Sequence, residues 1–403
     1  MTAMARALDA WKANFWRILF CVIVAGGLYL TIVRYSQGLG AVTNLSDQYP
    51  WGLWVGFDLL CGVGLAAGGF VLTAVVYVFH VERFRPVVRA TILTAFLGYL
   101  LVTTALLFDI GRPWAIWHPL VMWNPTSVMF EVSWCVTLYS TVLFLEFSGM
   151  LFEKLRWERA ARVQHAITVP AVIAGCVLST LHQSSLGTLY LIVPGKLHAL
   201  WYTSALPVLF FVSAICLGLA MVIVESHLSS RAFNRRLEMP LLTEIGRVLV
   251  ATLGVYAIIR FYDLANRGVL SRAFDFSYES CLFLVEVIPG LLVPLALLST
   301  RKIRNNTRWL YGSALLVVLG FMTHRLNVSI TGFEGAQGGH YLPSVSEAWI
   351  TLFLVALGFG AFRLAVRYLH VYPEPEDEDV PVTVTPHQQV VLARRSAAET
   401  TSV

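Results

Sequence analysis

Long apolar runs dominate the chain, and short polar segments separate them. Ten runs are long enough to cross the ~30 Å hydrocarbon core of a bilayer as helices that rise ~1.5 Å per residue. They lack the short polar–apolar alternation that is typical of a membrane β-barrel. The sequence therefore predicts an all-α integral membrane protein with ten transmembrane helices. The predicted spans cover residues 15–33, 53–80, 88–109, 127–152, 163–185, 200–225, 241–262, 278–300, 309–330 and 347–369.

Composition supports a membrane protein and excludes an ordinary soluble domain. Of the 403 residues, 57% are hydrophobic and 13% are charged, whereas soluble domains carry about 25% charged residues. No Ala-x-Ala cleavage site follows the first apolar run, so we expect a retained span and not a signal peptide. We expect residues 1–14 to be an N-terminal segment, 15–370 the membrane domain, and the acidic, proline-containing segment 371–403 a disordered tail.

Lysine and arginine are distributed unevenly between the two sides of the predicted bundle. Of the 29, twenty-one lie in or near the two termini and the loops on the same side, five lie in the opposite loops, and three lie within spans. Cytoplasmic segments of membrane proteins are enriched in these residues. We therefore expect both termini to be cytoplasmic.

The cysteines and histidines limit the metal chemistry. All six cysteines occur singly within apolar spans, and no Cys-x-x-Cys occurs. The sequence therefore predicts no iron–sulfur cluster and no metal site in this chain. His182 and His324 fall at similar depths, so a single haem stays open as an alternative. The paired histidines needed for two haems are absent.

The second span combines glycines with a buried acid. Gly62, Gly64, Gly68 and Gly69 predict close approach of another helix. Asp58 lies about two turns into the span from its outer end. Intramembrane charges are expensive and usually mark ion or substrate paths.

Other ionisable residues fall at the same depth as Asp58, in the outer third of several spans. Taken together they predict a polar pocket open to the outer leaflet. For three of them a structural role is an alternative: an ion pair between Asp109 and Arg112, a position at the membrane interface for Glu279, and a hydrogen bond from His182 to a neighbouring backbone carbonyl. The outer set is Asp58, Asp109, Glu131, His182, Arg260, Asp263, Glu279, Glu286, His324 and Arg325.

A second, thinner set leads towards the cytoplasm. Tyr99 lies near mid-membrane, and Glu225 lies at the inner end of its span. Carboxyl, phenol and imidazole groups pass protons on when burial and neighbours tune them. Glu131, His182, Tyr99 and Glu225 therefore form a candidate proton path, with an interfacial charge as the alternative for Glu225. Arg89, Glu146, Glu244 and Arg247 lie near the same face.

Four motifs resemble the NrfD/HybB family (polysulfide reductase NrfD-like), and most closely its [NiFe] hydrogenase branch. The resemblance covers roughly residues 15–370. The motifs are Trp51-Gly-Leu-Trp-Val-Gly-Phe-Asp58 with the glycine-rich run to Gly69, Phe130-Glu131, His182-Gln-Ser-Ser185, and Val193-Pro-Gly-Lys-Leu-His198 followed by Leu200-Trp201.

The resemblance implies a fold and a chemistry. Family members are haem-free, quinone-reactive subunits that hold two four-helix bundles, here spans two to five and six to nine, plus two flanking helices. A quinone (menaquinone or ubiquinone) binds near the periplasmic face, close to an iron–sulfur partner. By resemblance, Arg89, Tyr99, Glu131, His182 and Glu225 match proton-transfer positions. Asp58, Asp109, Arg112 and His182 match positions of the quinone region.

We therefore expect a quinone-reactive membrane anchor of a respiratory complex in the bacterial cytoplasmic membrane. A periplasmic iron–sulfur subunit and a catalytic subunit, in the first place those of a [NiFe] hydrogenase, are the expected partners. Nucleic acid is not. The alternatives are the quinone subunit of another molybdenum- or iron–sulfur oxidoreductase and a proton-coupled secondary transporter.

Overall fold

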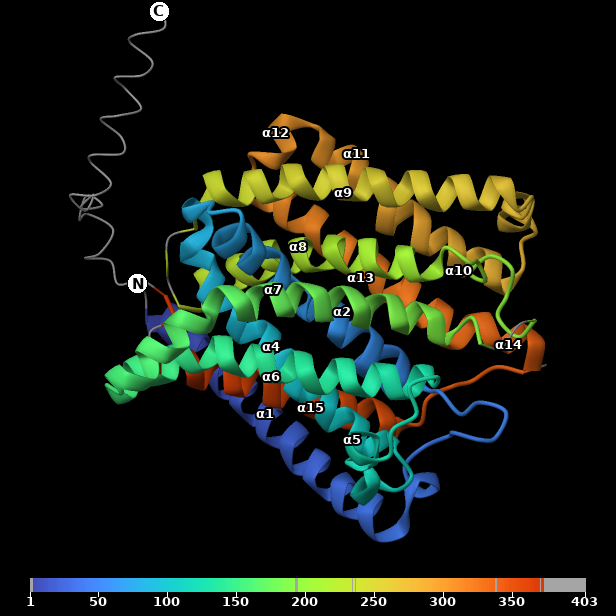
Figure 1. Ribbon diagram of the computed structural model, residues 1–403, viewed down its shortest axis with the longest axis horizontal. Coiled ribbons are helices and arrows are strands. Elements are labelled where there is room, and N and C mark those ends of the chain that lie inside the picture. Colours follow the sequence, from blue (N-terminus) through green and yellow to red (C-terminus); the bar gives the residue numbers. More distant parts are fainter. Residues whose placement is uncertain are drawn as a thin grey trace, which may run out of the picture.

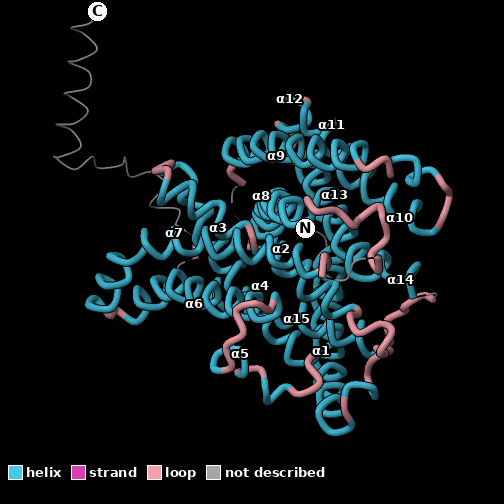
Figure 2. The backbone as a smooth tube through the Cα atoms, turned by 45° about the vertical axis from the view of Figure 1, so that its right-hand side comes forward, coloured by secondary structure: helices cyan, strands magenta, loops and turns pink. Residues whose placement is uncertain are grey.

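The computed structural model describes residues 3–192, 195–233, 235, 237–337, 339–369 and 371–372, with side chains from residue 14 onward except at 337. Every regular element in these ranges is helical, and no strand occurs among them (Figure 2). Ten helices are long and apolar enough to cross a membrane. The prediction of an all-α protein with ten transmembrane spans is therefore confirmed.

Several spans are built from consecutive short helices, among them π-helical turns (η2, η3, η7 and η8). In chain order the spans are α1 (Ala3–Gln37); η2 (Trp54–Cys61), α2 (Gly62–Ala66), α3 (Gly68–Thr73) and η3 (Ala74–Val78); α4 (Arg85–Asp109); α6 (Val128–Leu155); α7 (Glu158–Leu189); α8 (Leu206–Ala232); α9 (Met239–Asn266); α10 (Tyr278–Val287), η7 (Ile288–Leu292) and α11 (Val293–Ser299); α13 (Thr307–Leu326), η8 (Asn327–Thr331) and α14 (Gly332–Gln337); and α15 (Val345–Tyr368). The connecting turns are η1 (Leu39–Ala41), η4 (Glu82–Phe84), η5 (Pro113–Ala115), α5 (His118–Val121), η6 (Leu270–Phe274) and α12 (Arg301–Arg304).

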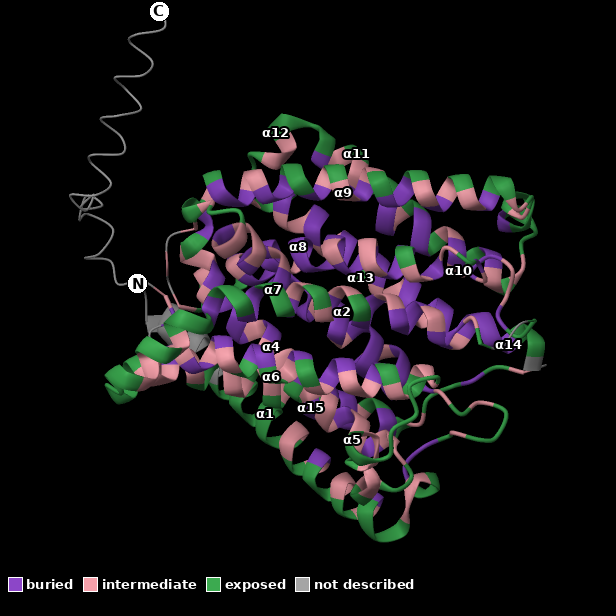
Figure 3. Ribbon diagram, viewed as in Figure 1, coloured by how far each residue is buried: buried purple, intermediate pink, exposed green. Residues whose placement is uncertain are grey.

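The long helices lie side by side, and successive spans run in opposite directions (Figure 1). Most of the second span and of α8 is buried, whereas very few of the described residues of α1 from Asn14 onward are buried (Figure 3). α1 packs on α15, where the indole N–H of Trp349 donates to the carbonyl of Ile23 at 3.2 Å. An exposed apolar surface of this kind suits contact with lipid. The grouping into two four-helix bundles stays a prediction.

Glycines set the closest helix contacts in the interior. A Cβ added at Gly68 or at Gly218 would clash with the backbone of the other helix, and the same holds for Gly290 and Gly320. Small residues allow helix backbones in a membrane to approach closely. The expectation of close approach at the glycines of the second span is therefore confirmed.

The two ends of the molecule differ in character. We call one the basic end, because arginines of η4, α4, the α6–α7 turn and α12 lie there. We call the other the aromatic end, because it carries Trp114, Trp117, Trp123 and Tyr341. The predicted N-terminal segment continues α1 from Ala3. Of the predicted tail, Val371 and Tyr372 pack at the basic end, and 373–403 lies outside the described residues.

Candidate functional site

A first group of polar side chains, the His182 cluster, lies where α4, α6 and α7 meet. The Tyr99 hydroxyl is hydrogen-bonded to Nδ1 of His182, with 2.9 Å between Oη and Nδ1. Its ring meets that of Tyr139 edge-on at 4.6 Å. The Ser185 hydroxyl donates to the Glu131 carboxylate at 2.5 Å. Residues three apart share a helix face, so His182 and Ser185 of α7 both reach this cluster.

The His182 cluster runs from the dry interior to the exposed aromatic end. Tyr99, Tyr139 and His182 are fully buried, whereas Glu131 is exposed. Nε2 of His182 and Oη of Tyr139 have no hydrogen-bond partner within the described residues. An unsatisfied buried polar atom costs about 1–3 kcal/mol, so it usually marks room for a ligand or a water. The arrangement suits passage of protons between the aromatic end and the interior.

The structure does not bring Arg89 or Glu225 into this cluster. Both lie at the basic end, as the sequence indicates. Arg89 forms an ion pair of 2.7 Å with Glu153. Glu225 accepts hydrogen bonds from Tyr372 at 3.3 Å and Ser229 at 3.4 Å. It also lines a cavity of about 10 Å³ between α3, α4 and α8, which has room for about one water.

The acids expected around the quinone form a separate Asp58 cluster near α15. Asp58 accepts a hydrogen bond of 2.8 Å from Thr351. One oxygen of Asp109 is buried without a hydrogen-bond partner in the described part of the chain, and no ion pair there joins Asp109 to the exposed Arg112. His182, which bonds Tyr99 and not a backbone carbonyl, lies in the other cluster. The single outer pocket predicted from the sequence therefore corresponds to more than one polar group.

The Asp58 cluster includes residues that the sequence did not single out. Glu347, at the start of α15, accepts from the Tyr341 hydroxyl and from the backbone N–H of Asn44 at 2.7 Å. Burial and the hydrogen bond to Glu347 raise the pKa of Tyr341 above its ordinary value. Ser344-x-x-Glu347 is a capping box, a pattern that marks a helix start in a sequence. The pattern alone does not reveal the contacts with Tyr341 and Asn44.

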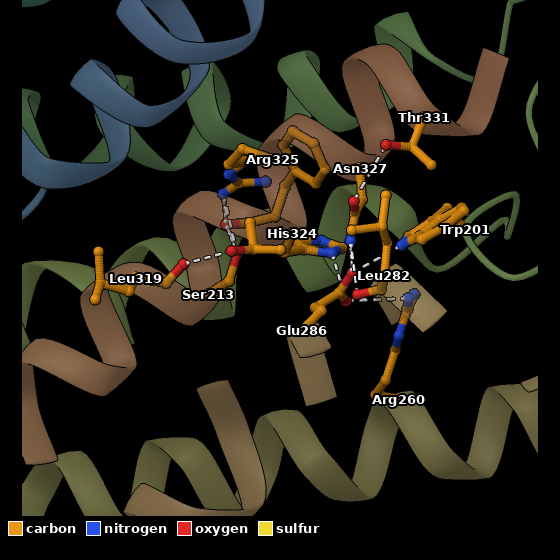
Figure 4. A network of polar contacts seen from close by, with 12 residues as sticks. Trp201, Ser213, Arg260, Leu282, Glu286, Leu319, His324, Arg325, Asn327 and Thr331 are labelled. Atoms are coloured by element: carbon orange, nitrogen blue, oxygen red, sulfur yellow. Dashed lines mark hydrogen bonds and ion pairs between the residues drawn. The ribbon is translucent and has the colours of Figure 1, made fainter. Parts of the chain in front are cut away.

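A third group, the His324 cluster, is centred on the carboxylate of Glu286 (Figure 4). Glu286 accepts from His324 Nδ1 at 2.8 Å and from Trp201 Nε1 at 2.8 Å. It also accepts from Asn327 at 3.0 Å and pairs with Arg260 at 3.5 Å. Each of these side chains is nearly or fully buried. The cluster consists of Trp201, Tyr256, Arg260, Glu286, His324 and Asn327.

Arg325, next to His324 in the chain, points away from this cluster (Figure 4). Its guanidinium donates to the Phe210 carbonyl at 3.0 Å and to the Ser213 hydroxyl at 2.9 Å, and it lies 3.5 Å above the Phe210 ring. Hydrogen bonds and an aromatic face are what a buried guanidinium requires. Arg325 therefore joins α13 to α8.

Metal-binding side chains do not gather in the described part of the chain. No group of three or more His, Cys, Asp or Glu there is placed to hold a metal ion, and the six cysteines are unpaired. His182 and His324 each use Nδ1 for a neighbouring side chain. Their Nε2 atoms have no hydrogen-bond partner among the described residues.

Comparisons with known proteins identify the family. The family model "Polysulphide reductase, NrfD" matches residues 41–334. A protein of Nitratidesulfovibrio vulgaris is 38% identical over 373 residues, which are 89% of this chain and 95% of that protein. The "Probable Ni/Fe-hydrogenase 2 b-type cytochrome subunit" of Escherichia coli is 33% identical over 367 residues, 90% of this chain and 93% of that subunit. The "Menaquinone reductase, integral membrane subunit" of N. vulgaris is 27% identical over 395 residues, 90% of this chain and 93% of that subunit.

These matches extend over nearly the whole membrane domain and confirm the resemblance seen in the motifs. The family model alone accounts for most of the chain, from the approach to the second span to α14. The chain therefore belongs to the polysulphide reductase NrfD family.

Proposed function

We propose that this protein is the haem-free, quinone-reactive membrane subunit of a respiratory oxidoreductase whose other subunits face the periplasm, and that this oxidoreductase is a [NiFe] hydrogenase. Relatives named for a Ni/Fe hydrogenase and for a menaquinone reductase support the partner class and the substrate. The second name also favours another iron–sulfur oxidoreductase as the alternative partner. The excess of arginine supports a cytoplasmic position for the basic end.

The observation that carries the proposal is the buried Tyr99–His182 hydrogen bond, with Glu131 held by Ser185 one helical turn further out. Reduction of a quinone takes up two electrons and two protons and yields a quinol. Electrons come from an iron–sulfur cluster of the partner at the aromatic end. Glu131 and His182 give protons to the quinone oxygens, and Tyr99 resupplies His182.

Protons that replace those used by the quinone come from the basic end in this proposal, where Arg89 and Glu225 lie. Electrons then enter from one side of the membrane and protons from the other. Each turnover separates charge, and each charge that crosses is worth ~2.3 kcal/mol per 100 mV of membrane potential. The rate at which these side chains carry protons is therefore expected to limit both the rate of quinone reduction and the charge separated across the membrane.

Asp58, Asp109 and Arg112 are assigned to a second edge of the quinone site at the aromatic end. The buried Asp109 oxygen has no partner within the described residues and is free to accept a hydrogen bond. Arg112 is exposed beside it in the chain. Asp58 is held by Thr351, so its contribution is to fix this edge against α15.

The test is Glu131→Gln in the intact complex. We expect assembly and dye-linked hydrogen oxidation to persist, and quinone-linked turnover to fall by about 100-fold or more, because a positioned proton donor contributes on that scale. Glu279→Gln is the matched control, since Glu279 also lies in the first turn of a span at the aromatic end. Undiminished quinone reduction by the Glu131 variant would contradict the assignment.

Two further measurements address the partner and the haem. Purification in mild detergent is expected to recover an iron–sulfur protein and a hydrogenase large subunit. Recovery of a different catalytic subunit would replace the hydrogenase in the proposal. An absorbance spectrum of the purified chain is expected to lack haem bands, and their presence would overturn the haem-free assignment.

A further inference from the structure

A cavity of about 130 Å³ opens at the basic end between α4, α6 and α7. It is far larger than the space that one water needs. The ion pair between Arg89 and Glu153, both partly exposed, stands at its rim. Its other polar lining groups include Tyr77, Glu146, Gln164, His165 and Thr168.

Glu146 is the buried carboxylate of this cavity. Its exposed fraction is 9%, and it forms no hydrogen bond or ion pair with the described residues. A carboxylate in such a place within a membrane span is costly, and it is tolerated where water reaches it or where it carries a function. Glu146 lines a cavity with room for several waters, through which water can reach the carboxylate.

Between Glu146 and the His182 cluster, α6 and α7 pack closely. Tyr139 lies seven residues before Glu146 on α6, which is about two turns and the same helix face. Opposite both lies Gly175 of α7: a Cβ there would lie 3.2 Å from Val142, 3.6 Å from the Tyr139 ring and 3.8 Å from a Glu146 oxygen. The missing side chain of Gly175 therefore lets α6, with Tyr139 and Glu146, pack directly against α7.

Buried hydroxyls lie along the same contact. Oη of Tyr139 and Oγ of Ser179, one turn after Gly175, lie near each other, and neither has a partner in hydrogen-bonding geometry within the described residues. Unpaired buried hydroxyls indicate sites for water. Tyr139 in turn meets Tyr99 edge-on at 4.6 Å, and Tyr99 is bonded to His182. Polar groups therefore follow one another from the basic end to the His182 cluster.

We propose that the cavity is the proton entrance of this subunit and that Glu146 is the residue that takes protons from it, which rests on the function proposed above. A cavity water gives a proton to the Glu146 carboxylate, and Glu146 passes it on to the Tyr139 hydroxyl by way of a water that enters between α6 and α7. Tyr139 and then Tyr99 each release their own proton onwards as they accept another, so neither changes its charge over a cycle.

The geometry favours this entrance over Glu225. The carboxylate of Glu225 is held by Tyr372 and Ser229, and its cavity has room for about one water. Glu146 has no such partners in the described part of the chain, and its cavity is an order of magnitude larger.

The test compares Glu146→Gln with Glu146→Asp in the intact complex in native membranes. Glu146→Gln is expected to lower quinone-linked turnover by about 100-fold while dye-linked activity of the partner subunits persists. Glu146→Asp is expected to retain most of the turnover. Added acetate, a weak acid small enough for the cavity, is expected to restore part of the turnover of Glu146→Gln, which a purely structural role of Glu146 does not predict. Glu244→Gln, another acid near the basic end, is the control.

Two substitutions test the proposed route, one by changing the packing between α6 and α7 and one by probing whether the cavity is accessible from the basic side. Gly175→Ala is expected to slow quinone reduction, because its Cβ presses on Val142 and displaces the face of α6 that carries Tyr139 and Glu146. Gly254→Ala on α9, where a Cβ meets nothing, is not expected to slow it. Thr168→Cys is expected to react with a membrane-impermeant thiol reagent added on the basic side. If the reagent does not react, the proposal that the cavity opens to water on the basic side is wrong.

The outcomes separate this proposal from the one on which it rests. If Glu131→Gln blocks quinone reduction while Glu146→Gln loses less than about tenfold, the entrance is wrong and the function stands. If both variants turn over normally, the function fails as well. A loss confined to Glu225→Gln would likewise overturn Glu146 as the entrance.

Discussion

The His182 cluster and the His324 cluster are built from the same residue types on corresponding spans, yet their hydrogen-bond partners differ. Tyr99 and Tyr256 lie on the third and seventh spans, Glu131 and Glu286 on the fourth and eighth, and His182 and His324 on the fifth and ninth. Three residues after each histidine stands the group that bonds the glutamate: Ser185 bonds Glu131, and Asn327 bonds Glu286.

The two clusters differ in the residue that lies four positions after the tyrosine. This residue is Thr103 on α4, which bonds back to the Tyr99 carbonyl at 2.9 Å, and Arg260 on α9, which pairs with Glu286. Arg260 and Trp201 both contact Glu286, which is buried and accepts a hydrogen bond from Nδ1 of His324. Without such a cation Glu131 stays exposed, and Nδ1 of His182 bonds Tyr99.

The continuation towards the basic end differs as well. Tyr139 of α6 lies eight residues after Glu131, and the residue eight after Glu286 is the buried Pro294 of α11. Gly175 of α7 lies seven residues before His182, and the residue seven before His324 is Val317 of α13, whose exposed fraction is 0%. Apolar groups thus stand where the proposed relay has the Tyr139 hydroxyl and Gly175. The same three residue types form the proposed proton path in one cluster and a buried ion-pair lock around Glu286 in the other, because their neighbours differ.

The largest effect is expected from breaking the lock. Arg260→Leu leaves Glu286 without its guanidinium partner, which for a buried pair costs about 3–5 kcal/mol. The free energy of unfolding in mixed detergent micelles measures this loss. The double variant Arg260→Leu/Glu286→Gln is expected to recover most of it, because it removes the unpaired charge and keeps an amide oxygen as acceptor for Trp201 and Asn327. A double variant no more stable than the single one would mean that the pair is not what stabilises this region.

The two histidines are expected to separate function from stability. His182→Asn should reduce quinone-linked turnover by about 100-fold, since it removes a group of the relay. His324→Asn should lower the melting temperature but keep turnover per assembled complex within about threefold of the wild type, because its partner Glu286 belongs to the lock. Equal turnover losses in the two variants would show that the clusters do not differ in this way.

The smallest effect is expected at Ser185. Ser185→Ala removes one hydrogen bond to the Glu131 carboxylate, which is worth about 1.5–3 kcal/mol for a buried charged partner and less at an exposed one. We therefore expect a drop in quinone turnover well below that of Glu131→Gln. A loss as large as that of Glu131→Gln would place Ser185 in the proton path itself, and kinetic isotope effects in heavy water would then distinguish the two variants.

Sequence alone identified the spans and the individual polar positions. Lipid offers no partner to backbone groups, so a membrane segment must be a long apolar helix, and length and apolarity are visible in a sequence. Asp58, Glu131, His182, Glu286 and His324 were likewise visible, because each interrupts an apolar run. The motifs around the second and fifth spans were sufficient to find the family.

Only the tertiary structure decided which of these residues meet. Asp58 bonds Thr351, 293 positions later in the chain, and Glu146 and Tyr139 both face Gly175 of another helix. A helix that is apolar all round carries no pattern that tells which face a neighbour covers. Partner choice depends instead on where glycines allow two helices to approach, and on single exchanges such as Thr103 against Arg260, whose consequence appears only once the helices are packed.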